Sequence, residues 1–192
     1  MTDKIYEGFL RRQEEQGMAL AADSDRLDLL PGPGEPPDAY IAKFHCKGFV
    51  RPALSAVTIA EHFLVAIKFP ADYLRRAEPF DVLRWVSPRE VFHPNISDKA
   101  PFICIGRLAP GTSLVDILYQ CFEIITYNKV TMREDDALNH EACAWARSNQ
   151  HRFPIDTRPL KRGHREFFIE GTGISAEGVD APLEGAGIDE VK

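Results

Sequence analysis

The sequence has few cysteines, and their spacing excludes the common zinc motifs. Its 192 residues contain four cysteines, none in a Cys-x-x-Cys pair: Cys46, Cys104, Cys121 and Cys143. His140 and Cys143 have a spacing that metal ligands on a helix use, but no second pair completes the four ligands of a structural zinc site. In a reducing compartment such scattered cysteines are expected to be free thiols rather than a disulfide framework. We expect no metal and no cofactor.

The sequence also lacks a long apolar run and a surplus of positive charge. No run approaches the ~20 residues that a membrane span needs, and residues 1–6 lack the apolar stretch of a secretory signal. The net charge is -6, from 23 Lys and Arg against 29 Asp and Glu, whereas phosphate binding requires a basic surplus. These absences predict a cytoplasmic protein with neither a membrane nor a nucleic acid as its partner.

Length and composition are typical of one globular domain. A chain of 192 residues with 44% hydrophobic and 27% charged residues can bury one core and is short for two domains. Apolar spacing predicts a helix over residues 4–22. Alternating runs then predict sequential strands that pair antiparallel near residues 27–30, 40–47, 62–69 and 80–86.

The last alternating run and the second half complete the expected fold. Phe80, Val82 and Val86 are expected on one face of the last strand, and Leu83 and Trp85 on the other. Apolar residues from 114 to 125 repeat at helical steps, with Thr112 or Ser113 as a possible N-cap. A polar stretch then leads to another helix, which carries Leu138, Ala142 and Trp145.

Beyond Asn149 the regular pattern ends. Residues 167–169, Phe-Phe-Ile, could add one edge strand. From Gly171 the chain is rich in Gly, Ala and acidic residues and is expected to be mobile. We therefore expect residues 1–152 to form the folded domain and residues 153–192 to form a C-terminal extension that is in part disordered.

Residues 93–95, His-Pro-Asn, and Cys104 place a turn, an amide and a thiol close together in an apolar stretch. A thiolate is a nucleophile that can carry an acyl group as a thioester without a catalytic triad. Cys46 and Cys121 fall on packing faces and Cys143 beside one, which leaves Cys104 as the candidate nucleophile. The same residues also fit a structural interpretation, in which the turn joins two segments and Cys104 is one more buried cysteine.

The turn is one of five segments that follow one another in an informative order: 67–73, 93–96, 103–105, 113–118 and 135–142. Together, within residues 40–147, they resemble the ubiquitin-conjugating enzyme (UBC-fold) family, and the His-Pro-Asn turn upstream of a cysteine is the specific part. The resemblance implies an α+β fold for residues 1–152. It consists of an N-terminal helix, an antiparallel meander of three to four strands, the turn with its cysteine loop, and two C-terminal helices.

The resemblance also implies a chemistry. In the family, an activating (adenylating) enzyme passes the C-terminus of a ubiquitin-like protein to a cysteine as a thioester. An amine, usually a lysine of a target protein, then attacks that thioester. Cys104 matches the acceptor cysteine. Asn95 matches an asparagine that either braces the loop or stabilises the tetrahedral oxyanion, a role in which a well-placed amide donor contributes ~3 kcal/mol.

Two further residues match positions of the family. His93 is expected to hold the turn by hydrogen bonds rather than to act as a base. Asp136 matches an acidic gate residue that orients the attacking lysine and favours its deprotonation, since local charge and desolvation both change the pKa of an amine. Aspartate is equally a good helix N-cap, and the residues alone leave both roles open for Asp136.

Several departures from the family pattern stand out. Asn95 and Cys104 are nine residues apart, slightly more than usual, so the loop between them must differ. Residues 109–112 replace the tryptophan that usually follows the cysteine. Residues 74–78 replace a proline-rich loop that contacts ligases, which leaves the use of a ligase open. These departures resemble the divergent bacterial members, which are similar to components of ubiquitin-like conjugation systems in anti-phage defence operons.

Two other functions fit the residue types. An inactive variant of the same fold could bind a ubiquitin-like protein without chemistry, and a deeply buried Cys104 would favour it. A cysteine hydrolase could use Cys104 with His93 and Asn95, which requires His93 within hydrogen-bond reach of the sulfur. A His93 ring directed away from Cys104 would count against the hydrolase.

Overall fold

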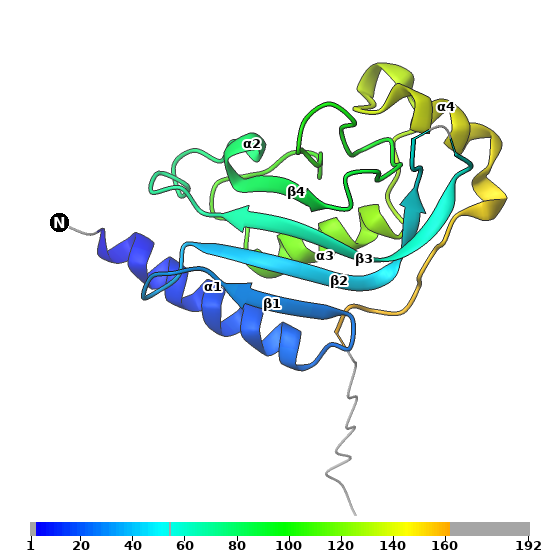
Figure 1. Cartoon of the computed structure of the whole chain (residues 1–192). Helices are drawn as coiled ribbons and strands as arrows, with labels where there is room; N and C mark the ends of the chain where they lie inside the picture. The colour runs from blue at the N-terminus through cyan, green and yellow to red at the C-terminus, as the bar shows by residue number, and fades with distance from the viewer. Residues whose placement is uncertain (1–2, 54, 162–192) are drawn as a thin grey trace, which may run out of the picture.

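The computed structural model describes residues 3–53 and 55–161. Its centre is a four-stranded antiparallel sheet in the order β1-β2-β3-β4, so every strand pairs with its neighbour in sequence (Figure 1). The strands are β1 Leu27–Pro31, β2 Ala39–Val50, β3 Thr58–Lys68 and β4 Leu83–Ser87. The predicted antiparallel meander is confirmed. The expected edge strand at 167–169 and the tail from Gly171 lie outside the described residues.

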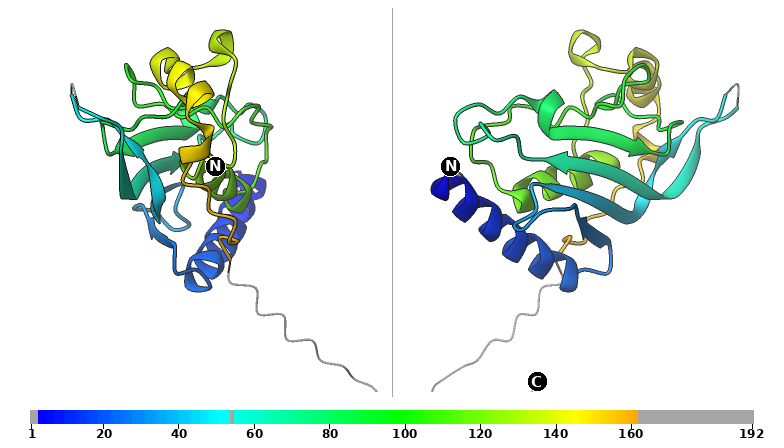
Figure 2. Two further views of the ribbon diagram at one scale, coloured as in Figure 1. Left: turned by 90° about the vertical axis from the view of Figure 1, so that its right-hand side faces the viewer. Right: turned by 60° about the vertical axis from the view of Figure 1, so that its left-hand side comes forward.

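Two helices cover one face of the sheet. α1 (Lys4–Ala22) packs on β1, and α3 (Leu114–Ile125) packs on β2 and on α1 (Figures 1 and 2). Fully burying one large apolar side chain contributes ~1.5–3 kcal/mol, and the layer between sheet and helices contains many of them. Those no more than 1% exposed include Phe44, Phe63, Val65, Ile67, Ile117 and Leu118.

One glycine sets the distance between the two helices. Gly17 lies in the middle of α1, where glycine costs ~1 kcal/mol relative to alanine. A Cβ at this position would be 2.6 Å from Cδ2 of Leu114, the first residue of α3. Beside it, the Gln13 side-chain oxygen accepts a hydrogen bond from the Leu114 N–H at 2.7 Å. The glycine thus allows α1 to reach the N-terminus of α3. Of the two N-cap candidates, Thr112 and Ser113, the structure has Ser113.

The expected strand from Phe80 is wrong in its first residues. Pro79–Val82 form one helical turn, α2, and β4 begins only at Leu83. Proline at the first helical position favours this start, because its fixed φ suits a helix and its missing N–H is not needed there. Leu83 and Trp85 are the buried side chains of β4, whereas Phe80 is 70% exposed and Val86 40% exposed.

The expected helix that carries Leu138, Ala142 and Trp145 begins only after Leu138. Residues Glu134–Asp136 form a 3-10 turn, η1, and α4 spans His140–Ser148, followed by a second 3-10 turn, η2, at Gln150–Arg152. The N-cap of α4 is Asn139, whose side-chain oxygen accepts from the Ala142 N–H at 2.9 Å. The N-cap interpretation of Asp136 is therefore wrong. A small second core of Phe49, Phe92, Tyr127, Ala142 and Ala146 joins α4 to the rest.

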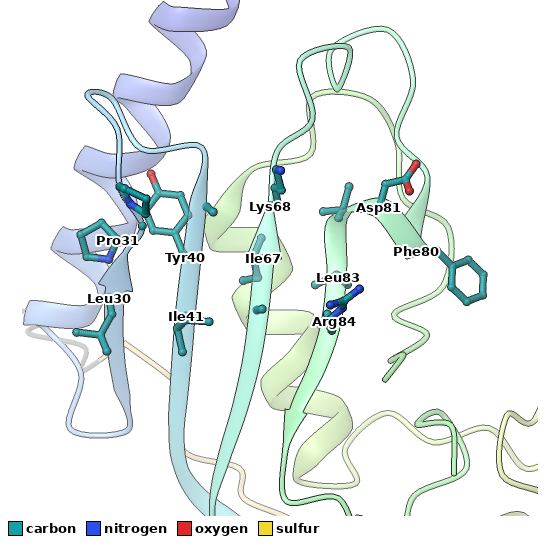
Figure 3. Close-up of a pocket in the computed structure, with 15 residues that line it drawn as sticks. Leu30, Pro31, Tyr40, Ile41, Ile67, Lys68, Phe80, Asp81, Leu83 and Arg84 are labelled. Carbon is teal, nitrogen blue, oxygen red and sulfur yellow. The ribbon is translucent and has the colours of Figure 1, made fainter. Parts of the chain in front are cut away.

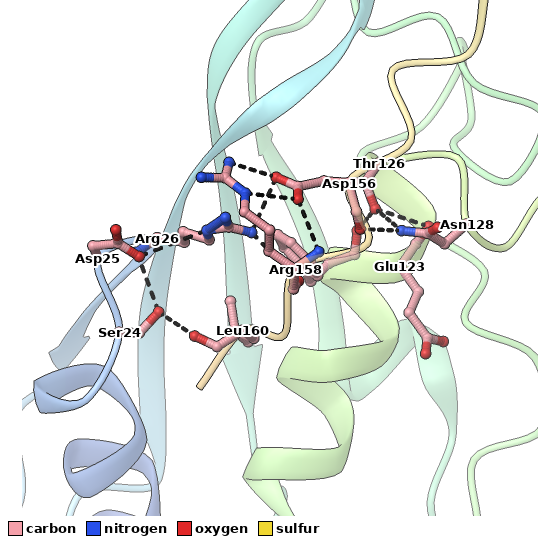
Figure 4. A network of polar contacts seen from close by, with 10 residues as sticks. Ser24, Asp25, Arg26, Glu123, Thr126, Asn128, Asp156, Arg158 and Leu160 are labelled. Atoms are coloured by element: carbon pink, nitrogen blue, oxygen red, sulfur yellow. Dashed lines mark hydrogen bonds and ion pairs between the residues drawn. The ribbon is translucent and has the colours of Figure 1, made fainter. Parts of the chain in front are cut away.

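The chain after η2 returns along the molecule to the start of β1 (Figure 4). Its Asp156 forms an ion pair with the buried Arg26 at 3.0 Å. The side chains of Arg158 and Arg26 hydrogen-bond this carboxylate and lower the pKa of Asp156 to about 2. Ser24 donates a hydrogen bond to the Leu160 carbonyl at 2.6 Å. Residues 153–161, the first part of the expected extension, are thus bound to the sheet and helix layers, and the boundary at residue 152 stays a prediction.

Candidate active site

The His-Pro-Asn turn and Cys104 lie on two short segments that pair antiparallel. Ile96 and Ile103 form an isolated β-bridge, and both side chains are fully buried. The Cys104 N–H donates to the Asn95 carbonyl at 2.8 Å, and the Ser97 N–H donates to the Phe102 carbonyl at 2.9 Å. The nine-residue separation therefore forms a hairpin, which places the Asn95 side chain beside the backbone of Cys104.

Cys104 is the one accessible thiol of the four cysteines, all of which lie in the described part of the chain. It is partly exposed, whereas the other three are buried. Burial raises the pKa of Cys46 and of Cys121 to about 12, and it also raises the pKa of Cys143. Thiolates are the reactive form, so the three buried thiols are poor nucleophiles. A deeply buried Cys104 would have favoured a binding module without chemistry, and Cys104 is partly exposed.

The Asn95 side chain connects the turn with the segment that follows α3. Its oxygen accepts from the Thr131 N–H at 2.8 Å, and its amide nitrogen donates to Thr131 Oγ1 at 2.8 Å. A longer contact of 3.4 Å joins the same amide nitrogen to the Cys104 carbonyl. Asn95 thus braces the loop. Only the N–H on the long contact is weakly held, and it lies beside the backbone of Cys104.

The His93 ring is used to hold the turn. Its Nδ1 accepts from the Asn95 N–H at 3.0 Å, which leaves the ring proton on Nε2. Nε2 is buried and has no hydrogen-bond partner among the described residues. Burial lowers the pKa of His93 to about 3, so the ring is neutral near pH 7. Because neither nitrogen bonds to Cys104, the geometry gives no support to the Cys-His hydrolase.

Tyr127 supports His93 and was not found from the sequence. Its ring lies 4.2 Å from the His93 ring, centroid to centroid, and its hydroxyl donates to the Phe92 carbonyl at 2.5 Å. The residue has a φ of 60°, a left-handed conformation that aromatic residues rarely adopt. It directly follows α3, so the chain reverses there and turns the ring under the His-Pro-Asn turn.

Two further supporting residues precede η1 and were also missed. Thr131 bonds Asn95 as described, and the Lys129 ammonium donates to the Ile105 carbonyl at 2.5 Å, one residue beyond Cys104. The backbone N–H groups of Leu138 and Asn139 both donate to the Pro94 carbonyl. The sequence offered one signal for this role, the polar run from Asn128 to Asp136 between two helices. A polar run predicts a loop, but it does not show which other residues that loop contacts.

Asp136 lies on the same segment as Thr131 but is not part of this buried network. Its side chain is 59% exposed, and one oxygen lies 3.5 Å from Nε of Arg133. The structure therefore brings His93, Asn95 and Cys104 together in direct or shared hydrogen bonds, and it leaves Asp136 on a neighbouring exposed turn. An exposed carboxylate in that position can attract an incoming ammonium group.

A separate groove lies on the sheet face opposite the two helices. Figure 3 shows it between the end of the β1–β2 hairpin and α2, and its volume is about 560 Å³. The lining includes Leu30, Ile41, Ile67, Phe80 and Leu83, with Lys68, Asp81 and Arg84 at charged positions. No cysteine or histidine lines it, so this groove adds neither a thiol nor an imidazole to the candidate site.

Comparison with known proteins addresses the fold. No family model matches the chain, and neither does any curated protein. A solved structure from Plasmodium yoelii, provisionally described as a ubiquitin conjugating enzyme, matches with a TM-score of 0.50 and 19% sequence identity. The match covers 75% of this chain and 86% of that one. The fold is UBC-like. At this identity the likeness speaks for the architecture alone. In the order of elements of this chain, Cys104 follows β4 and precedes α3.

The described residues give two negative findings. None of their helices is long and apolar enough to cross a membrane. No group of three or more His, Cys, Asp or Glu side chains within residues 3–53 and 55–161 is arranged to hold a metal ion. His140 is exposed and Cys143 is buried.

Proposed function

We propose that this chain is a ubiquitin-conjugating-like transferase that carries a ubiquitin-like protein as a thioester on Cys104. The observation that carries the proposal is the partly exposed Cys104 next to Asn95, in a UBC-like fold whose other three thiols are buried. The proposed partners are a ubiquitin-like protein, its activating enzyme and a target protein that supplies a lysine.

The proposed reaction has two steps, the charging of Cys104 and the transfer to a lysine. The Cys104 thiolate attacks the thioester carbonyl of the charged activating enzyme and expels that enzyme's cysteine thiolate. The neutral amine of the target lysine then attacks the new thioester, expels the Cys104 thiolate and releases one proton to solvent, leaving an amide. Asn95 braces the loop in both steps, and its weakly held N–H can donate to the oxyanion. Asp136 attracts the lysine in the second step.

The departures from the common pattern support a finer proposal. On the basis of the nine-residue separation of Asn95 and Cys104, residues 74–78 and residues 109–112, we propose that the chain is one of the divergent bacterial members. A cytoplasmic role in an anti-phage conjugation system follows from that placement. Genes for a ubiquitin-like protein and an activating enzyme beside this one would support it, and isolated occurrence of the gene would count against it.

A thioester assay tests the main proposal. The full chain is incubated with ATP and a panel of ubiquitin-like proteins, each with its activating enzyme, and is run on non-reducing gels. We expect an adduct that disappears on adding thiol and is absent in Cys104→Ala. The control is Cys46→Ala, which removes a buried thiol and should leave the adduct intact. An adduct that persists in Cys104→Ala would show that another residue is the nucleophile.

A further inference from the structure

A groove lies between β4 and residues 97–101, in the hairpin that precedes Cys104. Its volume is about 490 Å³. Part of its lining is apolar, from Trp85, Val86 and Pro101. The charged lining residues are Arg84, Arg89, Lys99 and Asp98.

Hydrogen bonds hold the outer wall of this groove in place. Ser97 Oγ accepts from the backbone N–H groups of Lys99 and Ala100, at 3.2 and 3.1 Å. The Pro101 carbonyl accepts from the Trp85 N–H at 2.9 Å, which attaches the loop to β4. The groove is therefore formed before any ligand arrives, and binding there would cost little ordering of the loop.

The charge of the groove is opposite to that of the chain. Arg84, Arg89 and Lys99 are exposed, and none of them forms an ion pair with a carboxylate of residues 3–53 or 55–161. Asp98 is the one carboxylate in the lining, so the lining carries three positive charges and one negative charge. The whole chain has a net charge of -6. Unpaired cations around an apolar floor provide charge complementarity to an acidic, partly apolar ligand.

The groove ends close to the candidate nucleophile. Pro101 stands three residues before Cys104, a separation of at most ~11 Å along an extended chain. An extended peptide covers the same distance in about three residues. A peptide whose acidic side chains lie in the groove would therefore bring a residue about three positions away to Cys104.

We propose that this groove binds an acidic segment of the target protein and so selects the lysine that is modified. The role in target selection rests on the proposed transferase function, whereas the binding of an acidic peptide does not. A nucleic acid is a poorer fit, because three cations in an acidic chain give a small phosphate footprint. Arg84, Arg89 and Lys99 would contact the carboxylates of the segment, and Val86 and Pro101 would contact its apolar side chains.

Fluorescence anisotropy with the full chain tests the groove directly. The probe is a labelled twelve-residue peptide with one lysine and glutamates three and four positions away, and its match has glutamine at both positions. We expect about tenfold tighter binding of the acidic peptide at 50 mM salt, declining toward equal binding at 300 mM because exposed charges are screened. The triple variant Arg84→Glu, Arg89→Glu, Lys99→Glu should lose the preference.

A matched variant and two competitors separate the remaining explanations. Reversing three exposed cations elsewhere changes the net charge equally and should keep the preference: Lys4→Glu, Arg12→Glu and Lys47→Glu. Equal binding of both peptides, or equal loss in both triple variants, overturns the inference.

Stronger competition by a single-stranded oligonucleotide of equal charge assigns the groove to nucleic acid and overturns the inference too. A further variant changes the acidic residues beyond 170 to amides: Glu177, Asp180, Glu184, Asp189 and Glu190. Tighter peptide binding by this variant would show that the chain's own tail occupies the groove, and it would also overturn the inference.

The thioester assay distinguishes failure of the inference from failure of the proposed function. If peptide preference is found but no thioester forms on Cys104, the groove stands and the transferase proposal falls. If Cys104 is charged but neither binding nor transfer depends on the glutamates, the transferase proposal stands and the groove assignment falls.

Discussion

On one side of Cys104 the His-Pro-Asn turn is held to residues 131–139 by hydrogen bonds among buried and partly buried groups. On the other side, residues 97–101 and β4 carry exposed charges that form no ion pair within the described residues. Removing a partner from a buried hydrogen bond leaves another group unsatisfied. Removing an exposed charge changes mainly a screened, long-range attraction. Substitutions on the first side should therefore change stability and rate together, and those on the second should change affinity or rate alone.

The four thiols should show the largest difference between buried and accessible groups. We expect iodoacetamide to modify Cys104 in the native protein about 10³-fold faster than Cys46, Cys121 or Cys143, because the buried thiols react only when the structure opens. Mass spectrometry of timed samples gives the four rates. Unfolding in urea should make the rates similar. A buried cysteine that reacts as fast as Cys104 in the native state would contradict the contrast.

Asn95→Ala should affect both stability and transfer. The substitution leaves the Thr131 N–H without its acceptor and removes the donor beside Cys104. We expect a loss of ~1–3 kcal/mol in the free energy of unfolding and about 100-fold slower discharge of the thioester. Urea denaturation and single-turnover gels measure the two effects. An unchanged denaturation midpoint would mean that Asn95 does not brace the loop.

Thr131 variants serve as the control for the two roles of Asn95. Thr131→Val removes the Oγ1 acceptor and frees one amide N–H of Asn95, whereas Thr131→Ser keeps the acceptor. If Asn95 acts only as a brace, Thr131→Val should slow discharge together with its loss of stability, and Thr131→Ser should restore both. If Asn95 donates to the oxyanion, discharge should remain fast in both variants.

His93 should make the stability of the turn depend on pH. Its pKa is about 3 in the folded chain, below the ordinary value of 6.5, because the ring is buried. The contribution of the neutral, buried His93 ring to the free energy of unfolding is therefore complete above pH 6.5. As pH falls from 6.5 toward 3, the unfolded chain takes up a proton that the folded chain does not, so the free energy of unfolding falls by up to ~1.4 kcal/mol per pH unit.

His93→Asn provides the measurement. Asparagine keeps a side-chain acceptor for the Asn95 N–H but does not titrate in this range. The urea-derived stability of the variant should therefore fall less steeply between pH 6.5 and pH 4.5 than that of the natural chain. Since the other titrating groups are shared, the difference between the two curves reports His93. Parallel curves would show that the ring is not kept neutral by burial.

Asp136→Asn should have the smallest effect. The carboxylate is exposed and lies near Arg133, and exposed charge pairs are worth at most ~1 kcal/mol. We expect two- to fivefold slower discharge to free lysine, with thioester formation and stability unchanged because Asn139 caps α4. Asp135→Asn, one residue earlier on η1, is the control. A 100-fold effect of Asp136→Asn would require a far more direct role in the reaction.

The elements predicted best are those whose pattern is local. The helices at 4–22 and 114–125 were expected with the bounds that α1 and α3 have, because apolar spacing and the Ser113 cap act within one element. Phe80 was assigned to a strand because alternation cannot distinguish a strand from one helical turn next to it. Its ring stacks on Phe102 with a centroid distance of 3.7 Å, a contact between residues far apart in sequence.

The sequence by itself determined the antiparallel meander, the two long helices, and the choice of Cys104 with its His-Pro-Asn turn as the candidate site. Only the tertiary structure decided what holds that site. Thr131, Lys129 and Tyr127 act through contacts with residues 24 to 36 positions away, and no periodicity encodes such pairs. The same holds for burial. The sequence places three of the four thiols on or beside packing faces, but packing of the whole chain decides which thiol meets solvent.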